Sequence, residues 1–325
     1  MIYTENALNV LTAKTYKGIG RAWIVKNLNY NIKVDVFISR LNKDAKEDYQ
    51  ITQEDFEKKK IIVINAIKKA EAFMDGFVAI GDTDFPPFRG IVKNSEQPIF
   101  LFYKGNLSLL SATNKNVAVI GLLNPDNDII KIEKEVVGEL VNSGVAIVSG
   151  LALGCDTIAH KQALDSNGKA IAILPSPLNN VLPATNKVLA NEILEKGGLL
   201  ITEYLTDAKS KMELASRYQE RDRLQALFSD CIVLSASYAK NDLGNDSGSR
   251  LAMGYAFDYS IPRAVIYDFE TDIDNPKFEL NRLYIREQKD IIVINRSNLI
   301  ESVRKIVAKR PLIMQNQPIQ KNLFG

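Results

Sequence analysis

The sequence predicts an α/β protein: a Rossmann-like, doubly wound and mainly parallel sheet, preceded by a small helical N-terminal domain. From residue 116 onward, short apolar runs alternate with stretches of helical length, as expected for strands buried on both faces and joined by helices. Residues 1–75 instead carry apolar side chains at helical spacing. At 325 residues, of which 46% are hydrophobic, the chain can bury such a core.

The expected elements follow one another as strand and helix, which implies right-handed crossovers within one sheet. The predicted strands cover residues 117–120, 145–149, 170–174, 199–203, 231–235 and 263–267. The predicted helices cover residues 129–142, 157–165, 187–196, 217–228 and 249–258. Two further short strands are expected, at residues 99–103 and 291–295.

Three parts of the chain are predicted. Residues 1–78 form the helical domain, in which Gly18 and Gly20 separate one helix from the next. Residues 79–310 form the Rossmann-like domain, and residues 311–325 form a polar, loosely ordered tail.

Composition narrows the possible partners. The net charge is +2, so any nucleic-acid surface must be a local patch. Two cysteines and one histidine are too few for the usual four-ligand zinc site without carboxylates, so we expect no metal and no cofactor. The chain shows neither a signal-peptide pattern nor a run of about 18 apolar residues. We therefore expect a cytoplasmic protein without a membrane partner.

Small residues lead from the second strand into a helix, which is a typical anion-binding arrangement because free N–H groups and the helix dipole point at the ligand. We expect phosphate contacts here from Ser149, Gly150, Gly154, Asp156 and His160. Asp156 is also the expected N-cap of that helix. His160 is the only histidine, and packing inside the helix is an equally good interpretation of it.

Three other segments add candidates for the same pocket: the loop after the first strand, the start of the helix at residues 187–196, and the segment that leads into the helix at residues 249–258. Gly121 follows the first strand, where a glycine lets the backbone approach a ligand. Hydroxyls and backbone amides near the start of the helix at 249–258 are candidates for holding a second phosphate, although an ordinary serine N-cap would explain one of the serines. The remaining predicted contacts are Lys187, Ser247, Gly248, Ser249 and Arg250.

Arginines cluster on the helix that precedes the fifth strand. Arg221 and Arg223 are both candidate phosphate contacts, but side chains two residues apart on a helix point about 200° apart. One is therefore expected to face the pocket while the other pairs with Asp222 or Glu220. A salt-bridged helix face is the alternative interpretation.

Taken together, these pieces resemble the DNA-processing protein A family (DprA, also called Smf). Residues 149–160 are close to the family's most specific signature, and Arg221, Asp222 and Arg223 stand where the family has Arg-Asn-Arg. Other segments that match in order and spacing are residues 81–87, 98–106, 202–204, 247–249 and 281–285. The resemblance implies a helix-hairpin-like N-terminal domain and a non-catalytic protein that binds single-stranded DNA. It also implies a homodimer that protects this DNA and loads a RecA-type recombinase during DNA uptake and natural transformation.

The sequence departs from the family at several places, among them the loop around Ser247, which has fewer glycines than is usual. Leu123 stands where the family has an arginine after the first strand, and Asp222 puts a carboxylate where the family has an amide. The loop at residues 175–183 also lacks the family's glycines. Leu123 removes one expected phosphate contact, and the Asp222 carboxylate weakens the expected attraction for phosphate.

Two other functions remain open at this stage. A phosphoribohydrolase-like enzyme would need a glutamate after the fifth strand, where this chain has Ala252 and Met253. A nucleotide-sensing module, for example in phage defence, fits the near-neutral charge and the altered loops.

Overall fold

The structure is a computed structural model that describes residues 2–28, 32–240 and 248–314. Its centre is one sheet in the strand order β1-β3-β7-β6-β5-β4-β8-β9-β10. The strands from β7 to β10 run parallel, whereas β3 pairs antiparallel with both β1 and β7. The bounds are β1 (Gly76–Ala79), β3 (Phe100–Gly105), β4 (Asn116–Ile120), β5 (Ala146–Ser149), β6 (Ala170–Ile173), β7 (Leu199–Thr202), β8 (Cys231–Leu234), β9 (Arg263–Ile266) and β10 (Ile292–Ile294).

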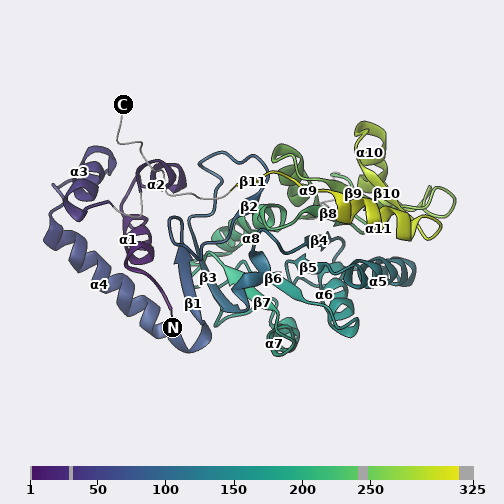
Figure 1. Cartoon of the computed structure of the whole chain (residues 1–325), viewed down its shortest axis with the longest axis horizontal. Helices are drawn as coiled ribbons and strands as arrows, with labels where there is room; N and C mark the ends of the chain where they lie inside the picture. Colours follow the sequence, from purple (N-terminus) through teal and green to yellow (C-terminus); the bar gives the residue numbers. More distant parts are fainter. Residues whose placement is uncertain (1, 29–31, 241–247, 315–325) are drawn as a thin grey trace.

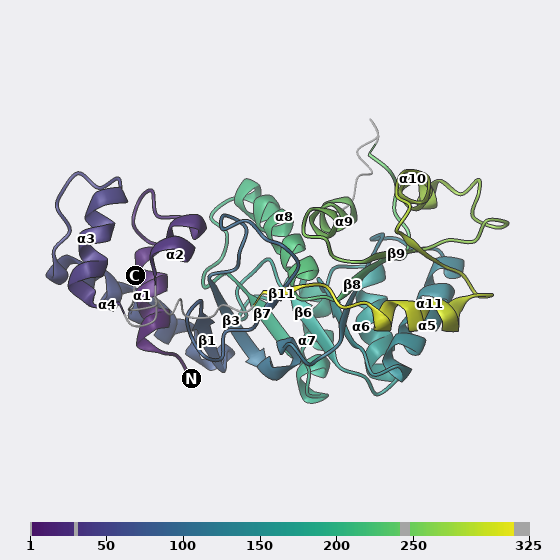
Figure 2. The same cartoon turned by 45° about the horizontal axis from the view of Figure 1, so that its top comes forward.

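Helices cover both faces of the sheet, which confirms the predicted Rossmann-like α/β class (Figure 2). One face carries α5 (Asn127–Asn142), α6 (Cys155–Asp165), α7 (Lys187–Glu195) and α11 (Leu299–Ala308). The other carries α8 (Lys211–Leu227), α9 (Ser249–Asp258) and α10 (Glu279–Glu287). The strands are buried on both faces, which explains why they were visible as continuous apolar runs.

The N-terminal helices lie beyond the β1 edge of the sheet (Figure 1). They are α1 (Glu5–Ala13), α2 (Arg21–Asn27), α3 (Val34–Asp44) and α4 (Gln53–Ala70). Thr52 and Asp55 form a capping box that begins α4. Polar contacts join these helices to the sheet, because Thr4 Oγ1 and Asn6 Nδ2 donate to Asp82 Oδ1 at 2.6 and 2.9 Å.

Several elements were not predicted. β1 crosses the predicted boundary at residue 78 and belongs to the sheet, while the division into domains stays a prediction. The short pair β2 (Phe88–Arg89) and β11 (Ile313–Met314), together with α10 and α11, was also missed. In the described part of the chain, no helix combines the length and hydropathy of a membrane span.

The strand order reverses direction between β4 and β8. The chain runs from β4 outward through β5, β6 and β7, and then returns to place β8, β9 and β10 on the other side of β4. In open α/β sheets, a crevice forms at the carboxyl ends of the strands at such a switch point. A ligand site is therefore expected beyond the ends of β4 and β8.

Candidate functional site

A cleft of about 380 Å³ opens at this switch point. It brings together five of the predicted site residues, which come from four loops and helices distant in sequence. These residues are Gly121, Asp156, Arg221, Gly248 and Ser249. The carboxyl ends of parallel strands meet at one edge, so the loops after β4, β5 and β8 contribute side by side.

In the loop from β5 into α6, the Asp156 carboxylate accepts the backbone hydrogen bonds that a bound anion would otherwise accept. Gly154, at φ +72°, is the N-cap of α6, so the prediction that Asp156 caps this helix is wrong. Asp156 Oδ2 instead reaches back and accepts from the N–H groups of Gly150 and Ala152, at 3.1 and 3.2 Å. The Gly150 amide was an expected phosphate donor, and Asp156 already accepts its hydrogen bond.

Arg221 lies at the floor of the cleft, between two acids. Its Nη1 is 3.7 Å from Asp156 Oδ2 and 3.5 Å from Asp222 Oδ1. The guanidinium packs directly on the backbone of Gly150, where a Cβ atom would collide with it. Glycine is therefore required at 150 for the approach of Arg221, whereas the sequence suggested the approach of a ligand.

Burial changes the charge of this cluster. It raises the pKa of Asp222 to about 7, against the opposing effect of Arg221. Burial also raises the pKa of Asp156, whose carboxyl is stabilised in the opposite direction by Arg221 and by backbone hydrogen bonds. Near neutral pH the cleft floor therefore holds one guanidinium and a carboxyl, Asp222, that is partly protonated.

Arg223 points away from the cleft into a buried ion pair. Its Nη2 and Nη1 donate to the two carboxylate oxygens of Glu203, at 2.7 and 2.9 Å, and its Nε donates to the Glu96 carbonyl at 2.8 Å. Arg21 of α2 contacts the same carboxylate at 3.1 Å. Of the predicted partners, Glu220 contributes its backbone carbonyl, which accepts from Arg223 Nη1 at 3.0 Å. The carboxylate that pairs with Arg223 is instead that of Glu203, which lies at the end of β7 where only the folded sheet presents it.

The model of the DNA recombination-mediator protein A family matches residues 76–304. The chain belongs to this family. Its matched region contains the whole cleft and every parallel strand of the sheet.

Relatives of the family are similar over part of their length. Protein Smf of Borreliella burgdorferi is 32% identical over 184 residues, which cover 54% of this chain and 56% of that protein. DNA processing protein DprA of Streptococcus pneumoniae is 36% identical over 131 residues, 40% of this chain and 44% of that protein. The matches thus span about half the length of these curated relatives.

Two solved structures of the family resemble this chain. The structure of DprA from Streptococcus pneumoniae superposes with a TM-score of 0.68 at 22% identity, over 93% of this chain and 98% of that chain, which shows the fold. DprA from Helicobacter pylori superposes with a TM-score of 0.52 at 28% identity, over 64% and 89%. That structure describes a single-stranded DNA binding mode of the Helicobacter protein.

Other candidates from the family's motifs lie outside the cleft lining. Ser149 is buried and donates to the Val119 carbonyl at 2.7 Å, Gly154 caps α6, and Lys187 is exposed at the start of α7. Arg250 is half-exposed in the first turn of α9, and Ser247 lies outside the described residues.

His160 is fully buried within α6. Burial lowers the pKa of its ring to about 3, so the ring is neutral at physiological pH. A neutral, enclosed imidazole offers no charge to a phosphate. The geometry therefore favours the packing interpretation of this family position over a ligand role.

Among the cleft residues that were not predicted are two polar side chains of α8, Tyr218 and Gln225. With Arg221 and Asp222 they occupy positions i, i+3, i+4 and i+7 of α8, which is one face of a helix. Gln225 Nε2 donates to Asp222 Oδ1 at 3.0 Å. The spacing was visible in the sequence, but the position of the cleft was needed to show which face of α8 matters.

Apolar side chains form much of the rim. Leu123 and Leu153 lie at the mouth of the cleft and are 55% and 47% exposed. Leu123 is where the family has an arginine, so this chain presents an apolar surface at that point. The Ser249 hydroxyl, at the start of α9, donates to the Gly121 carbonyl at 3.1 Å and joins the two loops.

Proposed function

We propose that this protein binds single-stranded DNA in the cleft at the switch point. The observation that carries the proposal is the position of Arg221. It is the one arginine or lysine among the described residues that line the cleft, and it lies beside the first turn of α9. A guanidinium and a helix N-terminus both favour phosphate. Tyr218, Leu123 and Leu153 offer surfaces on which bases can pack. The Helicobacter relative described for single-stranded DNA binding supports the same ligand.

The proposal extends to the family's cellular role. The protein would act in the cytoplasm as a homodimer, protect single-stranded DNA and load a RecA-type recombinase during DNA uptake. The resemblance supports these points. They are tested by sedimentation of the free protein and by recombinase-driven strand exchange on DNA coated with single-strand-binding protein.

Fluorescence anisotropy with a labelled dT20 oligonucleotide, across a salt series, tests the cleft. The logarithm of the affinity should fall linearly with the logarithm of the salt concentration, with a slope of about −0.7 per phosphate contacted. Arg221→Gln should weaken binding by roughly 10- to 100-fold, since a charge-assisted hydrogen bond contributes about 1.5–3 kcal/mol. It should also make the slope shallower by about 0.7.

Two matched variants make this test specific. Gly150→Ala keeps the charge but displaces the Arg221 guanidinium, so it should weaken binding in the same direction. Lys169→Gln removes an exposed charge just before the amino end of β6, whereas the cleft lies at the carboxyl ends of the strands. This variant should leave binding unchanged. Equal affinities for wild type and Arg221→Gln would contradict the proposal.

A nucleotide-sensing function is the second candidate, and the apolar residue Leu123 at the family's arginine position favours it. Competition decides between the two functions. If a mononucleotide saturates the cleft while dT20 does not bind, the sensor is correct. A phosphoribohydrolase is not supported, because Ala252 and Met253 are buried apolar residues where that enzyme needs a carboxylate.

Affinity for dT20 should rise as the pH falls from 8 to 6. Asp222, with a pKa of about 7, is negative at the upper end of this range and neutral at the lower end, so its repulsion of phosphate disappears. We expect roughly a three- to tenfold gain, from a charge several ångströms away in a partly solvated site. Asp222→Asn should flatten this dependence. Any remaining slope would then come from the other buried acids around α6, Asp156 and Glu133, whose pKa values burial also raises.

A further inference from the structure

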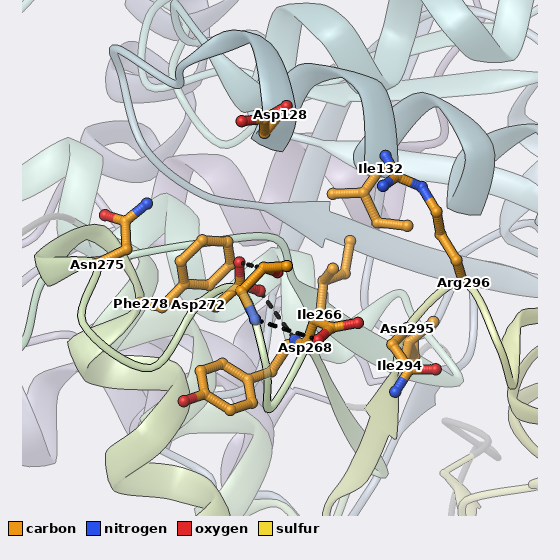
Figure 3. A pocket seen from close by; sticks show the side chains of 12 residues that line it. Asp128, Ile132, Ile266, Asp268, Asp272, Asn275, Phe278, Ile294, Asn295 and Arg296 are labelled. Atoms are coloured by element: carbon orange, nitrogen blue, oxygen red, sulfur yellow. Dashed lines mark hydrogen bonds between the residues drawn. The ribbon is translucent and has the colours of Figure 1, made fainter.

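A second hollow, of about 250 Å³, opens at the carboxyl ends of β9 and β10 (Figure 3). Its floor is apolar and includes Ile132 of α5, Ile266 of β9 and Ile294 of β10. Carboxylates surround the floor: Asp128 in the first turn of α5, and Asp268 and Asp272 in the loop after β9. None of these residues lines the cleft around Arg221, so the hollow is a separate feature.

Size and charge both disfavour a nucleotide in this hollow. Ligand pockets for drug-sized molecules usually measure about 300–1,000 Å³, which is larger than this one. Three carboxylates face it, and the one basic residue in its described lining, Arg296, donates through Nε to Glu135 at 3.0 Å. A phosphate would be repelled. A lysine or arginine side chain fits, because its methylene stem packs on the isoleucines while its charged end reaches the acids.

The loop after β9 adds exposed apolar side chains beside the hollow. Phe269 is 58% exposed and Ile273 is 57% exposed. The Phe269 ring meets the edge of Tyr267, with 5.1 Å between ring centroids, so its outer surface faces solvent in a defined position. Phe269 and Ile273 directly follow Asp268 and Asp272 in the chain, so exposed apolar side chains accompany two of the carboxylates that line the hollow.

Hydrogen bonds hold this loop in place without a partner. Asp268 Oδ1 accepts from the N–H groups of Glu270 and Thr271, at 2.9 and 3.3 Å, and Asp272 Oδ2 accepts from the Asp268 N–H at 2.8 Å. Arg282 Nη1 donates to the carbonyls of Asp272 and Asn275, at 2.8 and 2.9 Å. A preformed surface loses little conformational entropy on binding.

We propose that the hollow and its rim form a docking surface for another protein, through a segment that carries a lysine or arginine next to apolar residues. The basic side chain enters the hollow and meets Asp128, Asp268 and Asp272. Its apolar neighbours cover Phe269 and Ile273. Charge complementarity selects this occupant, since three acids beside exposed apolar groups repel DNA and attract a cationic, partly apolar chain. The surface is separate from the DNA cleft, so the two sites are testable independently.

The test uses the full chain and a fluorescein-labelled 12-residue peptide in which Leu-Arg-Leu units alternate with Gly-Ser. Expected is saturable binding, with methyl NMR shifts at Ile132, Ile266 and Ile273. Two variants should each raise the Kd of the peptide at least tenfold while dT20 binding is unchanged. One is the double variant Phe269→Ser, Ile273→Ser, and the other is Asp128→Asn. These side chains are exposed, and thermal unfolding verifies that the variants fold. Ile91→Ser, which removes an isoleucine that is 63% exposed elsewhere, is the matched control and should have no effect.

Four results would overturn the proposal. The first is equal binding of a peptide with every Leu replaced by Ser, or of spermidine, which would mean attraction by charge alone. The second is an unchanged Kd in the Phe269→Ser, Ile273→Ser variant. The third is a set of NMR shifts that map to other residues. The fourth is a change in sedimentation of the free protein on introducing these two substitutions, because the occupant would then be a second copy of this chain.

Discussion

Replacing Arg223 by methionine is expected to lower the free energy of unfolding by about 3–5 kcal/mol, since it leaves a buried carboxylate without its main partner. Glu203 is 7% exposed and receives two hydrogen bonds from Arg223. Burial by itself would raise the pKa of Glu203, yet Arg223 and Arg21 hold it below its usual value. Urea denaturation followed by circular dichroism measures the loss.

A double-mutant cycle provides the control for this prediction. Glu203→Met combined with Arg223→Met should be less destabilising than the sum of the two single changes, because neither charge is then left buried alone. Arg21→Gln should cost less than Arg223→Met, as its side chain is 23% exposed. If Arg223→Met instead retains full stability and loses dT20 binding, Arg223 contacts DNA, as its sequence position had suggested.

Introducing an arginine at Leu123 together with Asp222→Asn is expected to strengthen dT20 binding by roughly 10- to 100-fold. These changes restore the residue types typical of the family at both positions. Leu123 is 55% exposed at the mouth of the cleft, so an arginine there has room to reach a phosphate. A charged hydrogen bond to phosphate contributes about 1.5–3 kcal/mol. Removing the Asp222 carboxylate also eliminates its repulsion.

Anisotropy over a salt series measures this gain and its origin. The double variant should show a slope steeper by about 0.7, which corresponds to one additional phosphate contact. Ile91→Arg adds the same charge away from the cleft, where Ile91 is 63% exposed, and should give only a small change. Equal gains from Leu123→Arg and Ile91→Arg would indicate a general charge effect and would contradict a local phosphate contact at the cleft.

Some elements of the sheet were predictable from the sequence, and others were not. The strands from β4 to β9 were predicted within one or two residues, because a strand buried on both faces must be a continuous apolar run. β1 was missed although it is as long and as buried as several predicted strands, because it follows the N-terminal helices and stands outside the later alternation of strand and helix. β11 was missed because it has only two residues. β11 exists because it pairs with β2, more than 200 residues earlier in the chain.

The sequence by itself determined the α/β class and the set of loops that meet at one edge of the sheet. It also determined that Arg221 and Arg223 point in opposite directions, since helical geometry separates them by about 200°. Only the tertiary structure decided which arginine faces the cleft. Glu203 at the end of β7 holds Arg223, whereas the bare backbone of Gly150 admits Arg221. Glu203 lies 20 residues before Arg223 and Gly150 lies in the loop after β5, and the packing of the sheet sets the positions of both relative to α8.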